Sequence, residues 1–170
     1  VASAPAETFL EGDGVRLHYS VSGRGTPVLL IHGYSETAQR AWHDSGIVRA
    51  LADAGFQTIT YDCRGHGESS KPHTADRYGM PMVDDVRRLL DHLGIERTHL
   101  VGYSMGAAIA NKFREQHPNR LRRVVLAGYG EPPLPAEFSQ TLELEVRSNL
   151  QRMGLLDGND PKALALLSTR

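Results

Sequence analysis

The sequence predicts an α/β protein with a mostly parallel sheet and helices on both faces. Two observations predict this class. Short apolar runs alternate with amphipathic helical patterns from residue 27 to residue 128. The connections between successive strands are long enough to hold a helix, and such crossovers place each strand parallel to the one before it.

The predicted elements follow in order along the chain. Residues 15–23 alternate apolar and polar side chains, which is typical of a strand. Residues 27–33 form a continuous apolar run ending in glycine, as in a strand buried on both faces. A helix is predicted from about Ala41 to Ala54, with Gly55 as its stop. The remaining elements are a strand over 56–63, a helix over 82–94, a strand over 98–103, a helix from Met105 to His117 and a strand over 121–128.

The pattern changes after residue 130. The proline-rich stretch EPPLPAE leads into apolar residues at helical spacing over 137–153. Asp160 before Pro161 is typical of the start of another short helix. The sequence predicts no further strand, so the α/β fold is expected to be unfinished at this point.

Composition limits the class of protein. The formal net charge of the 170 residues is −1, whereas nucleic-acid-binding proteins normally carry a basic surface, so no nucleic-acid partner is expected. No apolar run approaches the roughly 20 residues that cross a bilayer. Cys63 is the only cysteine, which excludes an internal disulfide and a cysteine-based zinc site, and no metal or other cofactor is expected. The Ala2-Ser3-Ala4 stretch fits a processed signal peptide or a disordered leader, and slightly favours export over a cytoplasmic location.

Ser104 lies in the pentapeptide GYSMG, between a predicted strand and a predicted helix. This arrangement matches the G-x-S-x-G nucleophile elbow, in which a sharp turn lifts the serine hydroxyl clear of the sheet. Gly102 and Gly106 are expected there because a Cβ at either position would collide with the neighbouring strand and helix. The amides after the serine begin a helix, where a developing negative charge is stabilised. The motif therefore predicts a nucleophilic serine and not merely a small turn residue.

Three motifs, LLIHGYSET, YDCRGHGESSKP and LVGYSMGAAIA, follow strands whose carboxyl ends should share the ligand-binding edge of the sheet. In order and spacing they resemble the α/β-hydrolase superfamily, in its serine esterase and haloperoxidase-like branch, over about residues 10–130. The resemblance implies the N-terminal part of the α/β-hydrolase core over 1–131 and the start of a helical cap over 132–170. It implies a small-molecule acyl substrate, such as a carboxylic ester. Epoxide hydrolases of this fold use Asp as the nucleophile, so Ser104 argues against that subgroup.

The resemblance also implies roles for the matching positions. The backbone N–H groups of Met105 and Tyr34 would form the oxyanion hole. His32, beside Gly33, would support the oxyanion loop and not act as a base. Glu131 is a candidate acid, although an exposed glutamate at the start of the cap is the simpler interpretation.

No histidine in the sequence is well placed to activate the serine. In this family the order is nucleophile, acid, histidine, and the only histidine after Ser104 is His117, about 20 Å away along the helix. His66 and His73 follow a strand but are weak candidates. The base is therefore expected outside these residues, on a missing C-terminal segment or a second chain that completes the sheet. The alternative is a non-catalytic α/β-hydrolase-like module for binding or assembly.

Overall fold

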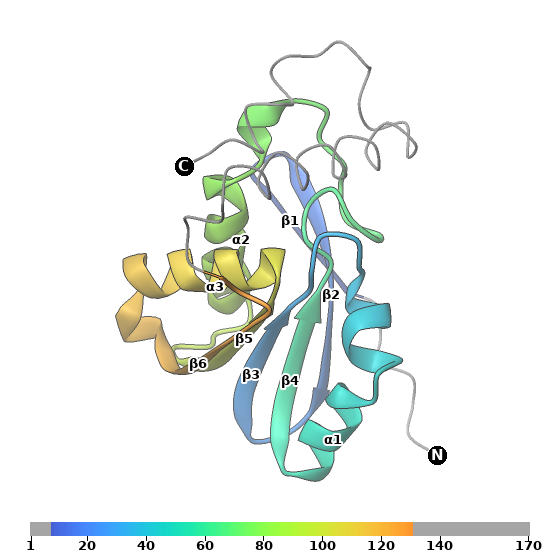
Figure 1. Cartoon of the computed structure of the whole chain (residues 1–170), viewed down its shortest axis with the longest axis vertical. Coiled ribbons are helices and arrows are strands. Elements are labelled where there is room, and N and C mark those ends of the chain that lie inside the picture. The colour runs from blue at the N-terminus through green and yellow to red at the C-terminus, as the bar shows by residue number, and fades with distance from the viewer. Residues whose placement is uncertain (1–7, 131–170) are drawn as a thin grey trace. The chain divides into compact units, whose positions relative to one another are not determined.

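The computed structural model describes residues 8–130 of the chain. Its strands are β1 (Thr8–Gly12), β2 (Val15–Gly23), β3 (Thr26–Ile31), β4 (Phe56–Tyr61), β5 (Thr98–Tyr103) and β6 (Leu121–Ala127). They form one six-stranded sheet in the order β1-β2-β4-β3-β5-β6 (Figure 1). Strands β4, β3, β5 and β6 run parallel, and β2 is antiparallel to both of its neighbours. The predicted mostly parallel sheet is confirmed.

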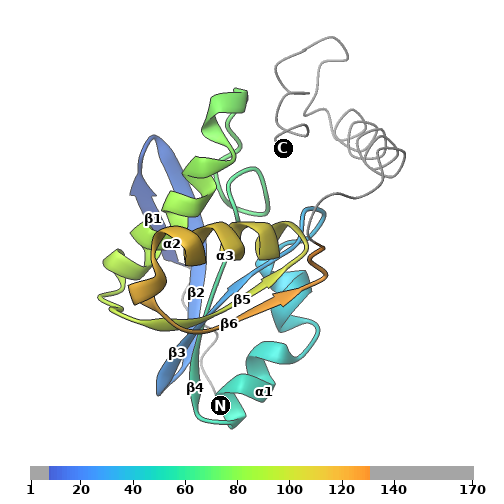
Figure 2. The ribbon, with the colours of Figure 1, turned by 60° about the vertical axis from the view of Figure 1, so that its left-hand side comes forward.

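Helices cover both faces of the sheet, as predicted. They are α1 (Ile47–Asp53), α2 (Met80–His92) and α3 (Met105–Gln116), with the short turns η1 (Gln39–His43), η2 (Ala75–Arg77) and η3 (Pro118–Arg120). Helix α3 packs on β5 and β6 and contacts α2, whereas α1 packs on β4. Figure 2 shows α1 on the opposite side of the sheet from α2 and α3.

Strand β3 lies in the middle of the core. Its last four residues are all buried, which fits the continuous apolar run in the sequence. Val28 and Leu30 pack with Trp42 and Val48 in one apolar cluster on the α1 side. Because side chains alternate along a strand, Leu29 and Ile31 face the other layer.

The continuous helix predicted from Ala41 to Ala54 is wrong. The segment consists of the single π-helical turn η1 followed by α1, and Gly46 separates them with a φ of +81°. Trp42 of η1 and Val48 of α1 nevertheless belong to the same apolar cluster. Apolar spacing alone therefore did not reveal the break.

Strand β1 was not predicted from the sequence. This strand pairs with β2 through a two-residue turn, and Gly12 lies opposite Val15. Asp13 and Gly14 of the turn have φ values of 51° and 65°, as a tight hairpin of this twist requires. An Asp-Gly pair at this position is the sequence signal that could have indicated the hairpin.

The described residues belong to two compact units. Residues 8–72 and 80–129 form the first, with the sheet and α1 to α3, and residues 73–79 and 130 belong to the second. The predictions for Ala2-Ser3-Ala4, for Glu131 and for the cap over 132–170 concern positions outside the described residues. No helix within residues 8–130 has the length and apolar character to cross a membrane.

Candidate active site

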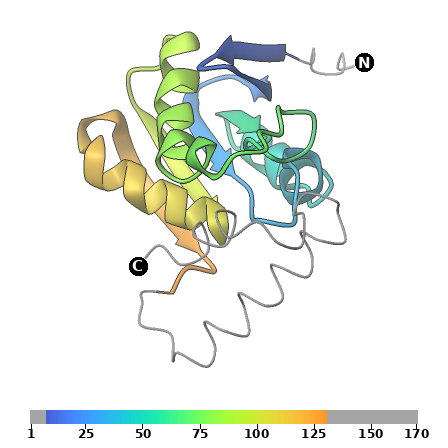
Figure 3. The same cartoon turned by 90° about the horizontal axis from the view of Figure 1, so that it is seen from above.

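The carboxyl ends of three strands lie side by side in the sheet. Ile31 of β3 is the register partner of Tyr61 in β4 and of Gly102 in β5. The three motifs that leave these strands therefore begin at one level of the sheet. Figure 3 shows the same ribbon from above. This edge is where open parallel sheets bind ligands.

Ser104 occupies a sharp turn between β5 and α3. Its φ of 52° and ψ of −113° make it one of two non-glycine residues with positive φ among residues 8–130. Its N–H donates to the carbonyl oxygen of Ala127 in β6 at 2.9 Å, and its own carbonyl accepts the N–H of Ala107 at 2.9 Å. The turn is thus held from both sides, and the serine is exposed. A backbone of this kind costs about 1–3 kcal/mol and persists only where its surroundings enforce it.

Two glycines let α3 approach the sheet closely. A Cβ on Gly102 would come within 3.0 Å of the carbonyl oxygen of Gly106 in α3. A Cβ on Gly106 would come equally close to the carbonyl oxygen of Ile31 in β3. The expected collisions are confirmed at both positions, and they explain how the helix N-terminus reaches the edge of the sheet.

The loop after β3 lies against the elbow. A Cβ on Gly33 would lie 3.5 Å from the Cβ of Ser104. Tyr34 is the next residue, and Met105 is the first residue of α3, whose N–H has no acceptor within the helix. The structure therefore brings Ser104, Met105 and the Gly33–Tyr34 turn together.

His32 ties this loop to the end of β4. The ring is fully buried, Nδ1 lies 2.7 Å from the carbonyl oxygen of Gly33, and Nε2 accepts the N–H of Cys63 at 3.0 Å. Nε2 must be unprotonated to accept, so the proton is assigned to Nδ1. Burial lowers the pKa of His32 and thereby favours this neutral form. Both ring nitrogens are engaged with backbone groups of Gly33 and Cys63, so neither is available as a base in this arrangement.

His66 joins the loops after β3 and β4. Its Nε2 lies 2.5 Å from the carbonyl oxygen of Tyr34, and its Nδ1 lies 3.2 Å from that of Arg64. The ring meets the ring of His32 edge-on, with 5.1 Å between centroids. His66, a weak candidate for the base in the sequence, is therefore engaged with backbone carbonyls.

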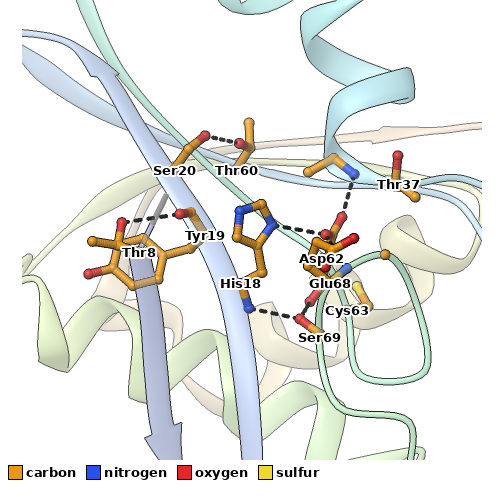
Figure 4. A network of polar contacts seen from close by, with 12 residues as sticks. Thr8, His18, Tyr19, Ser20, Thr37, Thr60, Asp62, Cys63, Glu68 and Ser69 are labelled. Carbon is orange, nitrogen blue, oxygen red and sulfur yellow. Dashed lines mark hydrogen bonds and ion pairs between the residues drawn. The ribbon is translucent and has the colours of Figure 1, made fainter. Parts of the chain in front are cut away.

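Asp62 links the loops after β3 and β4 to strand β2 (Figure 4). Its carboxylate accepts the N–H groups of Ala38 at 2.8 Å and Glu68 at 3.0 Å, and it lies 3.0 Å from Nδ1 of His18. Burial alone would raise the pKa of Asp62, but these hydrogen bonds outweigh it and lower the pKa below its usual value. Asp62 is therefore an ionised structural anchor at this edge.

Arg64 joins the loop after β4 to helix α2. Arg64 and Asp85 of α2 are each 1% exposed, and two hydrogen bonds of 2.7 Å join the guanidinium to the carboxylate. Sequence reasoning missed Asp85 as the partner of Arg64. The available signal was Asp85 itself, three residues after Met82 and four before Leu89 on the apolar face of a helix, since such a carboxylate is seldom buried without a cationic partner.

The other histidines of the first unit have partners away from the elbow. His18 bonds to Asp62, His43 to Thr60, and His92 to the hydroxyl of Tyr19, while His99 and His117 pack on Phe56 and Phe113. His73 belongs to the second unit. Within residues 8–130, no three or more His, Cys, Asp or Glu side chains gather in a way that could hold a metal ion.

A family model described as alpha/beta hydrolase fold matches residues 26–165. The chain belongs to this family. Over 114 residues it is 35% identical to the 2-hydroxy-6-oxo-6-phenylhexa-2,4-dienoate hydrolase of Comamonas testosteroni, covering 67% of this chain and 40% of that protein. Over 135 residues it is 36% identical to epoxide hydrolase A of Mycobacterium tuberculosis, covering 78% and 40%. The crystal structure of an epoxide hydrolase from Vigna radiata matches with a TM-score of 0.70 and 25% identity, over 78% of this chain and 43% of that one.

These relatives confirm the family and the fold that the three motifs indicated, and they are hydrolases by name. Their names specify a dienoate and epoxides, not a carboxylic ester. The chain spans about 40% of the length of the two curated relatives. The matched region includes the elbow of the α/β hydrolase and both loops beside it.

Proposed function

We propose that this chain supplies the nucleophile and the oxyanion hole of a serine hydrolase acting on carboxylic esters or related acyl compounds. The observation that carries the proposal is the position of Ser104. It sits in a positive-φ turn between β5 and the first residue of α3, with Gly33 packed beside it. This places a hydroxyl next to backbone N–H groups at a helix N-terminus, where anionic charge is favoured.

In the proposed reaction, Oγ of Ser104 attacks the carbonyl carbon of the substrate. A C–O bond forms, and the electrons of the carbonyl π bond move to its oxygen, where the N–H groups of Met105 and Tyr34 stabilise the charge. Collapse of this intermediate expels the leaving group and leaves an acyl-serine that water then hydrolyses. The proton from Oγ passes to a histidine outside this chain, because the histidines of the first unit have other partners and His73 precedes the nucleophile, against the family order.

The nature of the nucleophile favours a carbonyl substrate over an epoxide. An oxyanion hole stabilises charge that develops on a carbonyl oxygen. The substrate named for the Comamonas testosteroni relative contains a 6-oxo group, which is a carbonyl, whereas an epoxide has none. Of these two named chemistries, the carbonyl compound fits the proposed site better.

We further propose that the rest of the hydrolase chain supplies the base and completes the sheet on the free side of β6. The two curated relatives are more than twice as long as the regions that this chain matches. Strand β6 is the edge strand of the described sheet, and Val125 on it is 54% exposed. A groove of about 620 Å³ runs beside it over Val28 and Val101 on the α1 side, with Arg122 and Arg123 among its lining residues. An apolar surface of this kind fits a covering helix with an apolar stripe.

Fluorophosphonate labelling of the whole natural protein tests the catalytic proposal. We expect one label per molecule, lost in Ser104→Ala and retained in Ser45→Ala, a change at another exposed serine. We also expect hydrolysis of p-nitrophenyl esters that depends on Ser104, with no opening of styrene oxide. Failure of the whole protein to label at Ser104 would overturn the proposal and favour the non-catalytic binding or assembly module.

A further inference from the structure

We infer that His66 is a positioning residue for the proposed oxyanion hole. Its hydrogen bond to the Tyr34 carbonyl restrains the peptide after the Tyr34 Cα and so completes, together with His32, the placement of the Tyr34 N–H. The inference rests on the proposed function and deepens it. Its starting point is the 2.5 Å contact between Nε2 of His66 and the carbonyl oxygen of Tyr34. This contact joins residues 32 positions apart in the sequence.

The N–H of Tyr34 belongs to the same planar peptide as the carbonyl of Gly33 and points to the opposite side. Nδ1 of His32 lies 2.7 Å from that carbonyl oxygen, which also accepts the N–H of Glu36 at 3.2 Å. The first peptide plane at Tyr34 is therefore held through its oxygen. These contacts alone do not fix the second peptide plane at Tyr34.

His66 holds the second plane. The carbonyl of Tyr34 belongs to the peptide that follows the Tyr34 Cα, and it is the acceptor for His66. With both neighbouring planes held, φ and ψ of Tyr34 are restrained together. The two histidines thus act on successive peptides, and their rings touch edge-on at an angle of 65°.

The donor is itself rigidly placed. The N–H of His66 donates to the carbonyl of Cys63 at 2.9 Å, and the imidazole ring contacts the ring of Tyr34 edge-on at 5.7 Å. Because the acceptor at Nε2 is a carbonyl, the bond requires a proton on that nitrogen. Nδ1 also faces a carbonyl, that of Arg64, but at the longer distance of 3.2 Å, so we assign the single proton of the neutral ring to Nε2, the opposite tautomer from that of His32.

Two variants of the whole natural protein separate positioning from packing. His66→Phe keeps an aromatic ring against His32 and Tyr34 but has no donor, whereas His66→Gln keeps a side-chain N–H without the ring. We expect His66→Phe to lower kcat by about ten- to a hundredfold, as small misplacements at reacting centres do, with KM and Tm nearly unchanged. His66→Gln should recover part of kcat. A wild-type kcat in His66→Phe, or a loss that follows Tm and is not rescued by Gln, would overturn the inference.

Nuclear magnetic resonance gives a readout that does not depend on catalysis. Long-range ¹H–¹⁵N correlations should show His66 protonated at Nε2 at pH 7.5. In His66→Phe the amide resonances of Tyr34 and Ser35 should shift and their hydrogen exchange should accelerate. An unprotonated Nε2, or unchanged Tyr34 and Ser35 amides, would refute the positioning role. Failure of the proposed function is distinguishable, because it is recognised by absence of the Ser104 label in the unmodified protein.

Discussion

Gly106 of α3 lies so close to Ile31 of β3 that a Cβ on the glycine would come within 3.0 Å of the Ile31 carbonyl oxygen. This backbone-to-backbone approach seats the first turn of α3 on the central strand of the sheet. Ser104 lies two residues before Gly106, so the same approach sets the position of the hydroxyl. The position of the Ser104 hydroxyl therefore depends on the lack of a Cβ at Gly106.

Gly106→Ala is expected to destabilise the protein and to abolish labelling of Ser104. The added Cβ meets a carbonyl of the sheet, which cannot move aside as a flexible side chain could. Overpacking of this kind costs about 1–3 kcal/mol in the free energy of unfolding. Urea denaturation measures it. Gly130→Ala is the matched control, because a Cβ on Gly130 meets nothing within 4 Å, and it should leave stability unchanged.

Ser104→Gly is expected to be more stable than Ser104→Ala by about 1 kcal/mol. The backbone of Ser104 has a φ of 52°, which glycine adopts without the steric cost borne by alanine. Thermal melting of the two variants measures the difference. The order should reverse at Ser45, which is not among the residues with positive φ. A higher melting temperature for Ser104→Ala than for Ser104→Gly would show that the turn is not strained.

Asp85→Ala is expected to cost about 3–5 kcal/mol in the free energy of unfolding, because the buried guanidinium of Arg64 loses both hydrogen bonds to Asp85 and keeps the longer 3.3 Å contact with the more exposed Asp13. Asp84→Ala on the same helix is the control. Asp84 pairs with Arg87 at the surface, and such a pair contributes at most about 1 kcal/mol. Chemical denaturation of both variants compares them. Equal costs would mean that the Arg64–Asp85 pair does not anchor the loop.

Stability is expected to fall as the pH drops below 6.5, in part because of His32. Burial lowers the pKa of His32 in the folded protein below the ordinary value of 6.5. Above pH 6.5 the ring is neutral in both states, and its contribution is constant. Below pH 6.5 the unfolded chain binds a proton that the folded protein does not, so stability declines until the folded pKa is reached, by at most about 1.4 kcal/mol per pH unit.

His32→Gln tests this dependence. The variant should lose part of the decline in the urea midpoint between pH 7.5 and pH 5.5, because position 32 no longer takes up a proton on unfolding. His117→Gln serves as a control at a helix end away from the loop. A pH profile in His32→Gln that parallels the wild type would assign the decline to other groups.

The features that were predictable from the sequence are those whose geometry is determined by a few consecutive residues. Residues 27–33 were predictable as a strand buried on both faces because an uninterrupted apolar run needs two covering layers, and β3 has them. The elbow was predictable because five consecutive residues specify both the turn and the two close approaches at Gly102 and Gly106. The break at Gly46 was hidden because the apolar contacts continue across it.

The support of the site was much less predictable. The bonds of His32 to Cys63, of His66 to Tyr34 and of Arg64 to Asp85 join positions 21 to 32 residues apart. No period in the sequence links such pairs, since each depends on which strand ends become neighbours in the sheet. Resemblance to a family named the residues of these loops, whereas only the folded chain shows their partners.

The reactivity of the Cys63 thiol can report whether the loops held by His32 and His66 stay closed. Cys63 is the only cysteine of the chain, and its backbone bonds to both histidines through its N–H and its carbonyl. Burial raises the pKa of its thiol to about 12, so alkylating reagents should leave it untouched while the loops stay closed. Each opening of the loops would return the thiol to an ordinary pKa of about 8.5 and expose it. The rate at which iodoacetamide modifies Cys63 should therefore report how often these two loops open.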